Sequence, residues 1–261
     1  TILVKRYGLS YRILLVLEML LFLLPIAIGF RKTCKRPIYA LLLLFLLGFY
    51  FSSFNISRQM IAVSFVFCAY CYLGKKDWIK GAVFILIGFL FHLSSIVSIL
   101  ALPFIFFDFR KKIVNILIIG SFLFAYIYDL SGLASEVISR VPLLNQYQYY
   151  ATTLAFDGSK GLQLFTLFTN IIYLYLFNKQ DNHWDIFAKI TLFGLVFSNL
   201  MAFAPSYLSR LFVYFNIATI PYFVSFNVRR DRIIIVEYSI LYFCYYTLYY
   251  GLDGVIPYKF M

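Results

Sequence analysis

Long apolar runs, separated by short polar turns, recur along the whole chain. Each run is close to the ~20 residues that an α-helix needs to cross the hydrocarbon core of a bilayer. The apolar segments lie at residues 13–30, 38–54, 57–73, 79–107, 113–130, 162–178, 186–204, 210–227 and 233–252. No fixed-period repeat or low-complexity linker interrupts them. The pattern predicts one all-α, polytopic integral membrane domain over residues 1–261, with about nine or ten transmembrane or half-membrane helices.

Composition and charge exclude two other classes of protein. The chain is 63% hydrophobic and 13% charged, with a mean hydropathy of +0.86, which lies outside the balance of a water-soluble domain. A net charge of +12 is typical of nucleic-acid binding only when the basic residues follow one face. Here they form short clusters between apolar runs, so the charge indicates membrane topology, and no nucleic acid is expected as a partner.

The basic clusters predict an orientation, because Lys and Arg are enriched in cytoplasmic loops. The clusters are Arg31–Arg36, Lys75–Lys80, Arg110–Lys112 and Arg229–Arg232. A single crossing by segment 79–107 would leave Arg110–Lys112 outside, against this rule. Two short helices that meet near Phe91-His92-Leu93-Ser94, the second capped by Ser94 or Ser95, would bring that cluster inside. We therefore predict a broken helix here, with one unbroken helix as the alternative.

This topology brings several polar features to the external face. They are the start of segment 57–73, the turn at His92, the start of segment 210–227 and the long loop 131–161. Long loops with polar residues are frequent sites of function. The prediction therefore places Arg58, His92 and Arg210 on one side of the membrane.

Arg58 is a candidate for binding a phosphate. It follows Asn55 and Ser57, so a helix is expected to begin here with its positive dipole end and unpaired N–H groups facing outward. A guanidinium group at such an end suits an anionic ligand. The alternative is an interfacial arginine that reaches lipid headgroups. Gln59 is a candidate contact of the substrate or a polar contact between helices.

His92 and Arg210 are the other two candidates for chemistry. At a turn between apolar half-helices, His92 could accept a proton from a substrate hydroxyl or orient that hydroxyl, although a purely structural histidine is the alternative. Arg210 follows Pro205-Ser206-Tyr207-Leu208-Ser209, which predicts a second helix start with a cation for an anion.

Several common motifs are missing from the sequence. It contains no D-x-D, G-x-x-x-x-G-K-[ST], G-x-S-x-G or H-E-x-x-H. Metal-held nucleotide sugars and ATP are therefore not expected as substrates, and no metal or cofactor is expected. The four cysteines lie in or beside apolar segments and are interpreted as small hydrophobic residues rather than as disulfides or metal ligands.

Four short motifs, in order along the chain, carry a resemblance to a known family. They are Asn55-Ile56-Ser57-Arg58-Gln59-Met60-Ile61-Ala62 with the basic turn Lys75-Lys76, then Phe91-His92-Leu93-Ser94-Ser95, then Ser209-Arg210-Leu211-Phe212-Val213-Tyr214-Phe215, and finally Ile256-Pro257-Tyr258-Lys259-Phe260. In this order and spacing the chain resembles the EpsG-like and Wzy-type bacterial polysaccharide (O-antigen) polymerases. Family members usually begin with further helices and an outer loop bearing an acidic residue, so N-terminal helices are expected to be missing here.

The resemblance implies a fold, a reaction and a set of residues. It implies a GT-C-like glycosyltransferase that joins undecaprenyl-diphosphate-linked oligosaccharide repeats into O-antigen or exopolysaccharide, on the periplasmic face of the bacterial inner membrane. Donor and acceptor are both lipid-linked, and a chain-length regulator is an expected protein partner. The implied catalytic residues are Arg58, His92 and Arg210, and the implied substrate contacts are Asn55, Gln59, Arg140, Tyr214, Tyr258 and Lys259.

Three other functions remain open from the residues alone. A ligase or another lipid-linked glycosyltransferase would use the same donor with a different acceptor. A polysaccharide transporter or flippase should show paired repeats and interrupted helices at the midplane, and the sequence has no such internal symmetry. A structural subunit without a site is the third alternative, and the predicted convergence of Arg58, His92 and Arg210 on one face argues against it.

Overall fold

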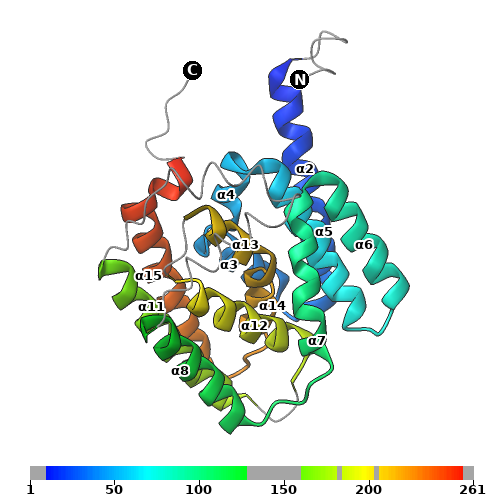
Figure 1. The fold of residues 1–261 in the computed structure, drawn as a ribbon. Helices are drawn as coiled ribbons and strands as arrows, with labels where there is room; N and C mark the ends of the chain where they lie inside the picture. Colours follow the sequence, from blue (N-terminus) through cyan, green and yellow to red (C-terminus); the bar gives the residue numbers. More distant parts are fainter. Residues whose placement is uncertain (1–9, 128–159, 181–183, 203–205, 255–261) are drawn as a thin grey trace. The chain divides into compact units, whose positions relative to one another are not determined.

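A computed structural model describes residues 10–127, 160–180, 184–202 and 206–254. These residues form helices joined by turns and contain no strand, so the all-α prediction is confirmed for them (Figure 1). The helices are α2 (Tyr11–Thr33), α3 (Pro37–Leu46), α4 (Phe49–Asn55), α5 (Ser57–Leu73), α6 (Trp78–Phe91), the 3₁₀ helix η1 (Leu93–Ala101), α7 (Leu102–Ile105), α8 (Lys111–Ile127), α11 (Lys160–Lys179), α12 (Ile186–Leu200), α13 (Ser206–Asn216), α14 (Thr219–Val224) and α15 (Arg229–Gly254). They belong to two compact units, residues 1–99 with 217–261 and residues 100–216.

Among the described residues, one helix is both long enough and apolar enough to cross a bilayer alone. The apolar stretch Arg12–Thr33 of α2 spans 22 residues, and α3 with α4 would make a second span although they are bent by 54°. The other apolar helices that the structure describes, such as α5 and α12, have 10–17 residues. Most predicted spans are thus shorter than one full crossing, and the number of crossings stays a prediction.

The bend between α3 and α4 was not predicted from the sequence. Gly48 separates the two helices and has a φ of +80°, in the left-handed region that only glycine adopts without strain. A Cβ at Gly48 would also lie 3.3 Å from the ring of Tyr246 on α15. Segment 38–54 is therefore two helices because its central residue permits a sharp turn beside α15.

The predicted break in segment 79–107 is confirmed. Helix α6 ends at Phe91, His92 has an extended backbone with φ −153° and ψ 120°, and η1 begins at Leu93. Of the two predicted caps, Ser95 is excluded, because its hydroxyl is buried and makes no hydrogen bond with the described residues. The Ser95 N–H instead donates to the carbonyl of His92 at 3.0 Å.

Helix α5 forms the centre of the first unit. It lies between α2 and α6 and is buried along most of its length (Figure 1). Close approach of α6 depends on Gly88, where an added Cβ would lie 3.2 Å from the carbonyl oxygen of Ala62. Small residues at such a crossing allow the backbones of membrane helices to pack tightly.

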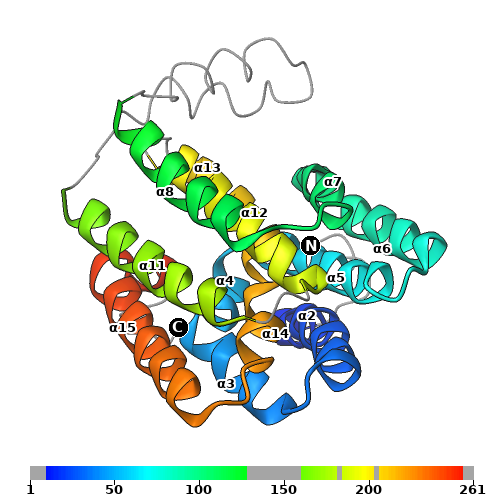
Figure 2. The ribbon, with the colours of Figure 1, turned by 90° about the horizontal axis from the view of Figure 1, so that it is seen from below.

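In the second unit, α8 lies alongside both α11 and α12 (Figure 2). A buried amide pair connects these helices, with Asn170 Nδ2 donating to Asn199 Oδ1 at 2.9 Å and Asn199 Nδ2 donating to Asn170 Oδ1 at 2.8 Å. Asn199 also donates to the Ser121 hydroxyl at 3.0 Å. Hydrogen bonds of this kind between membrane helices contribute roughly 0.6–2 kcal/mol each, so the pair fixes the packing of three helices.

Candidate functional site

The antiparallel hairpin of α5 and α6 defines the candidate site. The two helices are joined by a short turn after Leu73, and the ring of Phe65 stacks on that of Phe91 with centroids 5.5 Å apart. The register is set by Ala62, which lies opposite Gly88, and by Phe65, whose ring also stacks on that of Phe84 with centroids 6.2 Å apart. One helical turn further toward the start of α5, the same register places the first turn of α5 at the level of His92. Two motifs more than 30 residues apart in the sequence therefore share one end of the first unit.

Arg58 is the second residue of α5 and is exposed. The predicted start of this helix at Ser57 is confirmed, and its N-cap is Ile56, which provides no side-chain hydrogen bond. The N-cap position itself therefore gives no side-chain hydrogen bond, and the start of the helix carries the positive end of the helix dipole. A guanidinium group beside such an end suits an anionic group of a ligand.

Two further candidate contacts flank Arg58. Asn55 is the last residue of α4 and is exposed, whereas Gln59 is buried in the first turn of α5. Helices α4 and α5 pack against each other across the single residue Ile56. The polar residues of this motif are therefore presented by two consecutive helices at one end of the hairpin.

His92 is half-buried and lies at the end of α6. Its N–H donates to the carbonyl of Gly88 at 3.0 Å, and its own carbonyl accepts from Ser95 N–H at 3.0 Å. These bonds fix the backbone of the turn between α6 and η1. A histidine held in this way keeps a defined position while part of its side chain stays exposed, which suits proton transfer or orientation of a hydroxyl.

The second unit holds two predicted site residues. Arg210 is exposed on α13, but the prediction that a helix begins at Arg210 was wrong, because α13 begins at Ser206. Arg210 therefore lies one turn inside the helix. Tyr214 is fully buried, so its ring is not placed to stack on a sugar in this conformation. The remaining predicted residues, Arg140, Tyr258 and Lys259, lie outside the described residues, as does loop 131–161.

Comparison with known families tests the resemblance that these motifs carry. The model of the EpsG family matches residues 1–260. The chain belongs to the EpsG family. No curated protein and no solved structure matches the chain. EpsG proteins are Wzy-like polymerases, so the resemblance carried by the short motifs is confirmed.

Family membership gives the general activity of this EpsG protein. It is a membrane protein with a polysaccharide-polymerase-like, glycosyltransferase-type activity. Sequence reasoning found Arg58 and His92 through their motifs and predicted them on one side of the membrane, and the α5–α6 hairpin puts both at one end of the first unit. The signal was available in the sequence, because a turn of a few residues between two apolar helices makes them antiparallel neighbours.

Proposed function

We propose that this EpsG protein joins undecaprenyl-diphosphate-linked oligosaccharide repeats into O-antigen or exopolysaccharide, at the periplasmic face of the bacterial inner membrane. The observation that carries the proposal is the pairing, within one hairpin of an EpsG chain, of the Arg58 end of α5 with the break at His92. The guanidinium group of Arg58 suits an anionic leaving group, and the imidazole of His92 suits a hydroxyl nucleophile. Transfer of a sugar from a lipid diphosphate needs both.

The chemistry of the donor explains the need for Arg58. In the proposed step, an acceptor hydroxyl oxygen attacks the anomeric carbon, and the bond from that carbon to the phosphate oxygen breaks. The electron pair leaves with the lipid diphosphate, which remains anionic and needs cationic and N–H donors more than it needs a proton. The guanidinium group of Arg58 and the N–H groups at the start of α5 supply these donors.

The acceptor hydroxyl is a poor nucleophile, so a base or an orienting acceptor assists it. His92 takes this role and receives the proton that the hydroxyl loses. Asn55 and Gln59 are the proposed substrate contacts beside Arg58, and Arg210 is the proposed second contact for an anionic group. Arg140, Tyr258 and Lys259 stay predictions from the sequence, and a chain-length regulator stays the predicted protein partner.

Deletion of the gene tests the proposed function. We expect surface polysaccharide to collapse from a ladder of lengths to single repeat units on gels, with the ladder restored by the wild-type gene. If the gene encoded a ligase, its deletion would instead leave polymer on the lipid carrier. If it encoded a flippase, its deletion would remove even the single repeats. Either of these patterns would contradict the proposal.

The proposed side of action has its own test at the two ends of α5. We expect a cysteine at Asn55 to react with a membrane-impermeant maleimide in spheroplasts, and a cysteine at Lys75 to react only after the membrane is opened. Cys244→Ser provides the background, because Cys244 is exposed whereas the other three cysteines are buried. The reverse labelling pattern would place the Arg58 end in the cytoplasm and exclude a periplasmic site.

A further inference from the structure

Three basic turns meet at the end of the first unit opposite the Arg58 end of α5. A hydrogen bond from Arg36 Nη1 to the carbonyl of Phe226 at 3.3 Å connects the turn after α2 to the turn after α14. A second, from Lys32 Nζ to the Tyr72 hydroxyl at 3.3 Å, connects α2 to the end of α5. We call this end the basic end, defined as residues 31–36, 72–80 and 226–232. It holds ten Lys and Arg residues and two Asp residues, a formal charge of +8.

The two carboxylates at the basic end already have partners. Asp77 caps α6 by accepting from Lys80 N–H at 3.2 Å, and it pairs with Lys80 Nζ at 2.8 Å. The hydrogen bond from the Lys80 side chain holds the pKa of the Asp77 carboxyl below its ordinary value, so this pair stays ionised at neutral pH. Asp231 lies 3.9 Å from Arg230 Nε. Most of the positive charge is therefore left for anions from outside the protein.

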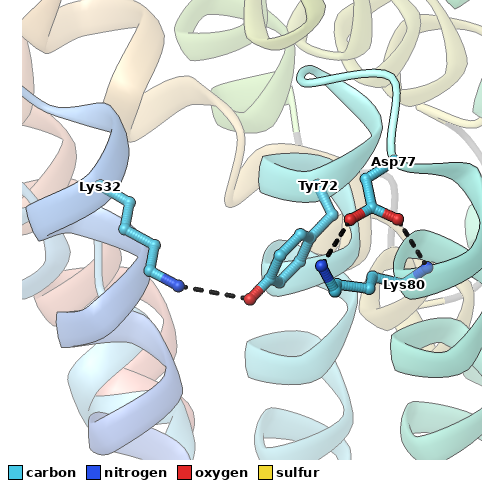
Figure 3. Close-up of polar contacts among 4 residues, drawn as sticks. All are labelled: Lys32, Tyr72, Asp77 and Lys80. Carbon is cyan, nitrogen blue, oxygen red and sulfur yellow. Dashed lines mark hydrogen bonds and ion pairs between the residues drawn. The ribbon is translucent and has the colours of Figure 1, made fainter.

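Lys32 and Tyr72 form a defined pair of donors within this surface (Figure 3). The ammonium groups of Lys32 and Lys80 lie 5.2 and 5.6 Å from the centre of the Tyr72 ring, which fixes the tyrosine between two cations. The Tyr72 oxygen accepts from Lys32, and the described part of the chain provides no acceptor for the Tyr72 O–H. An ammonium and a phenol O–H at this spacing match two oxygens of one phosphate group.

The position of this pair favours a lipid phosphate over a soluble one. Lys32 lies in the last turn of α2, whose stretch Arg12–Thr33 is long and apolar enough to cross a membrane, and so at the expected membrane boundary. Each basic turn contains, or is closely followed by, an apolar side chain that is largely exposed, namely Ile38 (83%), Ile79 (80%) and Val228 (57%). Cations next to exposed apolar groups suit the junction of headgroups and acyl chains. A soluble acidic partner would leave these apolar side chains uncovered.

We propose that the basic end binds anionic phospholipid headgroups, with the Lys32 ammonium and the Tyr72 hydroxyl holding one phosphate group between them. This site is distinct from the Arg58 end and does not depend on the polymerase function. Bound anionic lipid then stabilises the ends of α2, α5 and α6, so the stability of this region depends on the lipid composition of the membrane.

Lipid binding to the purified full chain tests this proposal. Phosphatidylglycerol and phosphatidylcholine are titrated into detergent-solubilised protein, and bound lipid is counted by native mass spectrometry. We expect wild type to prefer phosphatidylglycerol and Lys32→Gln to bind it about fivefold more weakly. Tyr72→Phe keeps the ring and its cation contacts and loses only the O–H, so it should fold and also bind more weakly. Lys112→Gln, an exposed lysine of another basic cluster, is the charge-matched control and should bind like wild type.

Three results would overturn the proposal. One is equal affinity for phosphatidylglycerol in wild type, Lys32→Gln and Tyr72→Phe. Another is an equal loss in Lys112→Gln, which would indicate an effect of net charge without a site. The third is full displacement of the lipid by inorganic phosphate at the same concentration, which would identify a free anion as the ligand.

Discussion

Replacement of His92 with alanine is expected to abolish long polysaccharide chains while the protein remains in the membrane. His92 lies outside both helices of the break, at the end of α6, and its backbone bonds to Gly88 and Ser95 do not need the imidazole ring. Loss of a general base typically lowers a rate by about a hundred- to ten-thousandfold. Gels of surface polysaccharide, with protein levels matched by immunoblot, measure this effect.

His92→Gln separates the two roles that the ring could have. An amide keeps a hydrogen-bond acceptor but cannot take up a proton at neutral pH. Long chains from the Gln variant, with none from the Ala variant, would mean that His92 orients the acceptor hydroxyl. Wild-type chain lengths from both variants would make His92 structural and move the catalytic base elsewhere, with Asp157, an acidic residue of the predicted external loop 131–161, as the first residue to test.

The parts of the fold that could be predicted depend on strong local signals. The ends of α5 follow from an apolar run bounded by polar residues, and the structure places them at Ser57 and Leu73 as predicted. The break at His92 was predicted from charge on both sides of the segment, since one unbroken crossing would have put Arg110–Lys112 on the wrong side. Both signals lie close to the feature that they determine.

Features that depend on distant contacts were missed. The bend at Gly48 lies within a continuous apolar run, where an isolated glycine is usually tolerated inside a helix, and its surroundings include Tyr246 almost 200 residues away. The start of α13 was misplaced because serines at both 206 and 209 are residue types that favour the beginning of a helix. Sequence pattern ranks such alternatives poorly, because tertiary packing decides between them.

In the candidate sites, too, residues with a local signal were predicted and contacts between distant residues were not. Arg58 and His92 were found because each lies in a polar break between apolar runs, where an ionisable residue is costly unless it has a role. The pairing of Lys32 with Tyr72 was not found, since the two residues lie 40 positions apart and Tyr72 falls inside an apolar segment. Only the packing of α2 against α5 brings them together.

Arg58→Lys is expected to lower polymerisation almost as much as Arg58→Ala. The guanidinium group offers a planar pair of N–H donors to a diphosphate, beside the N-terminal end of α5, and an ammonium group replaces the charge without that geometry. Removal of one donor that stabilises developing negative charge typically costs about a hundred- to a thousandfold in rate. Both variants should therefore give short chains or single repeats on gels at normal protein levels.

Arg12→Lys and Arg12→Ala are the matched controls for this prediction. Arg12 is also an exposed arginine in the first turn of a long helix of the same unit, but the Ser10 hydroxyl accepts from its N–H at 3.3 Å and so caps that end. Substitutions at Arg12 should leave the ladder of chain lengths unchanged. A full ladder from Arg58→Lys, with a loss only in Arg58→Ala, would instead show that a positive charge at this position is enough. Such a result would fit an arginine that reaches lipid headgroups, and the contact with the leaving diphosphate would have to come from another cation, with Arg210 as the first candidate.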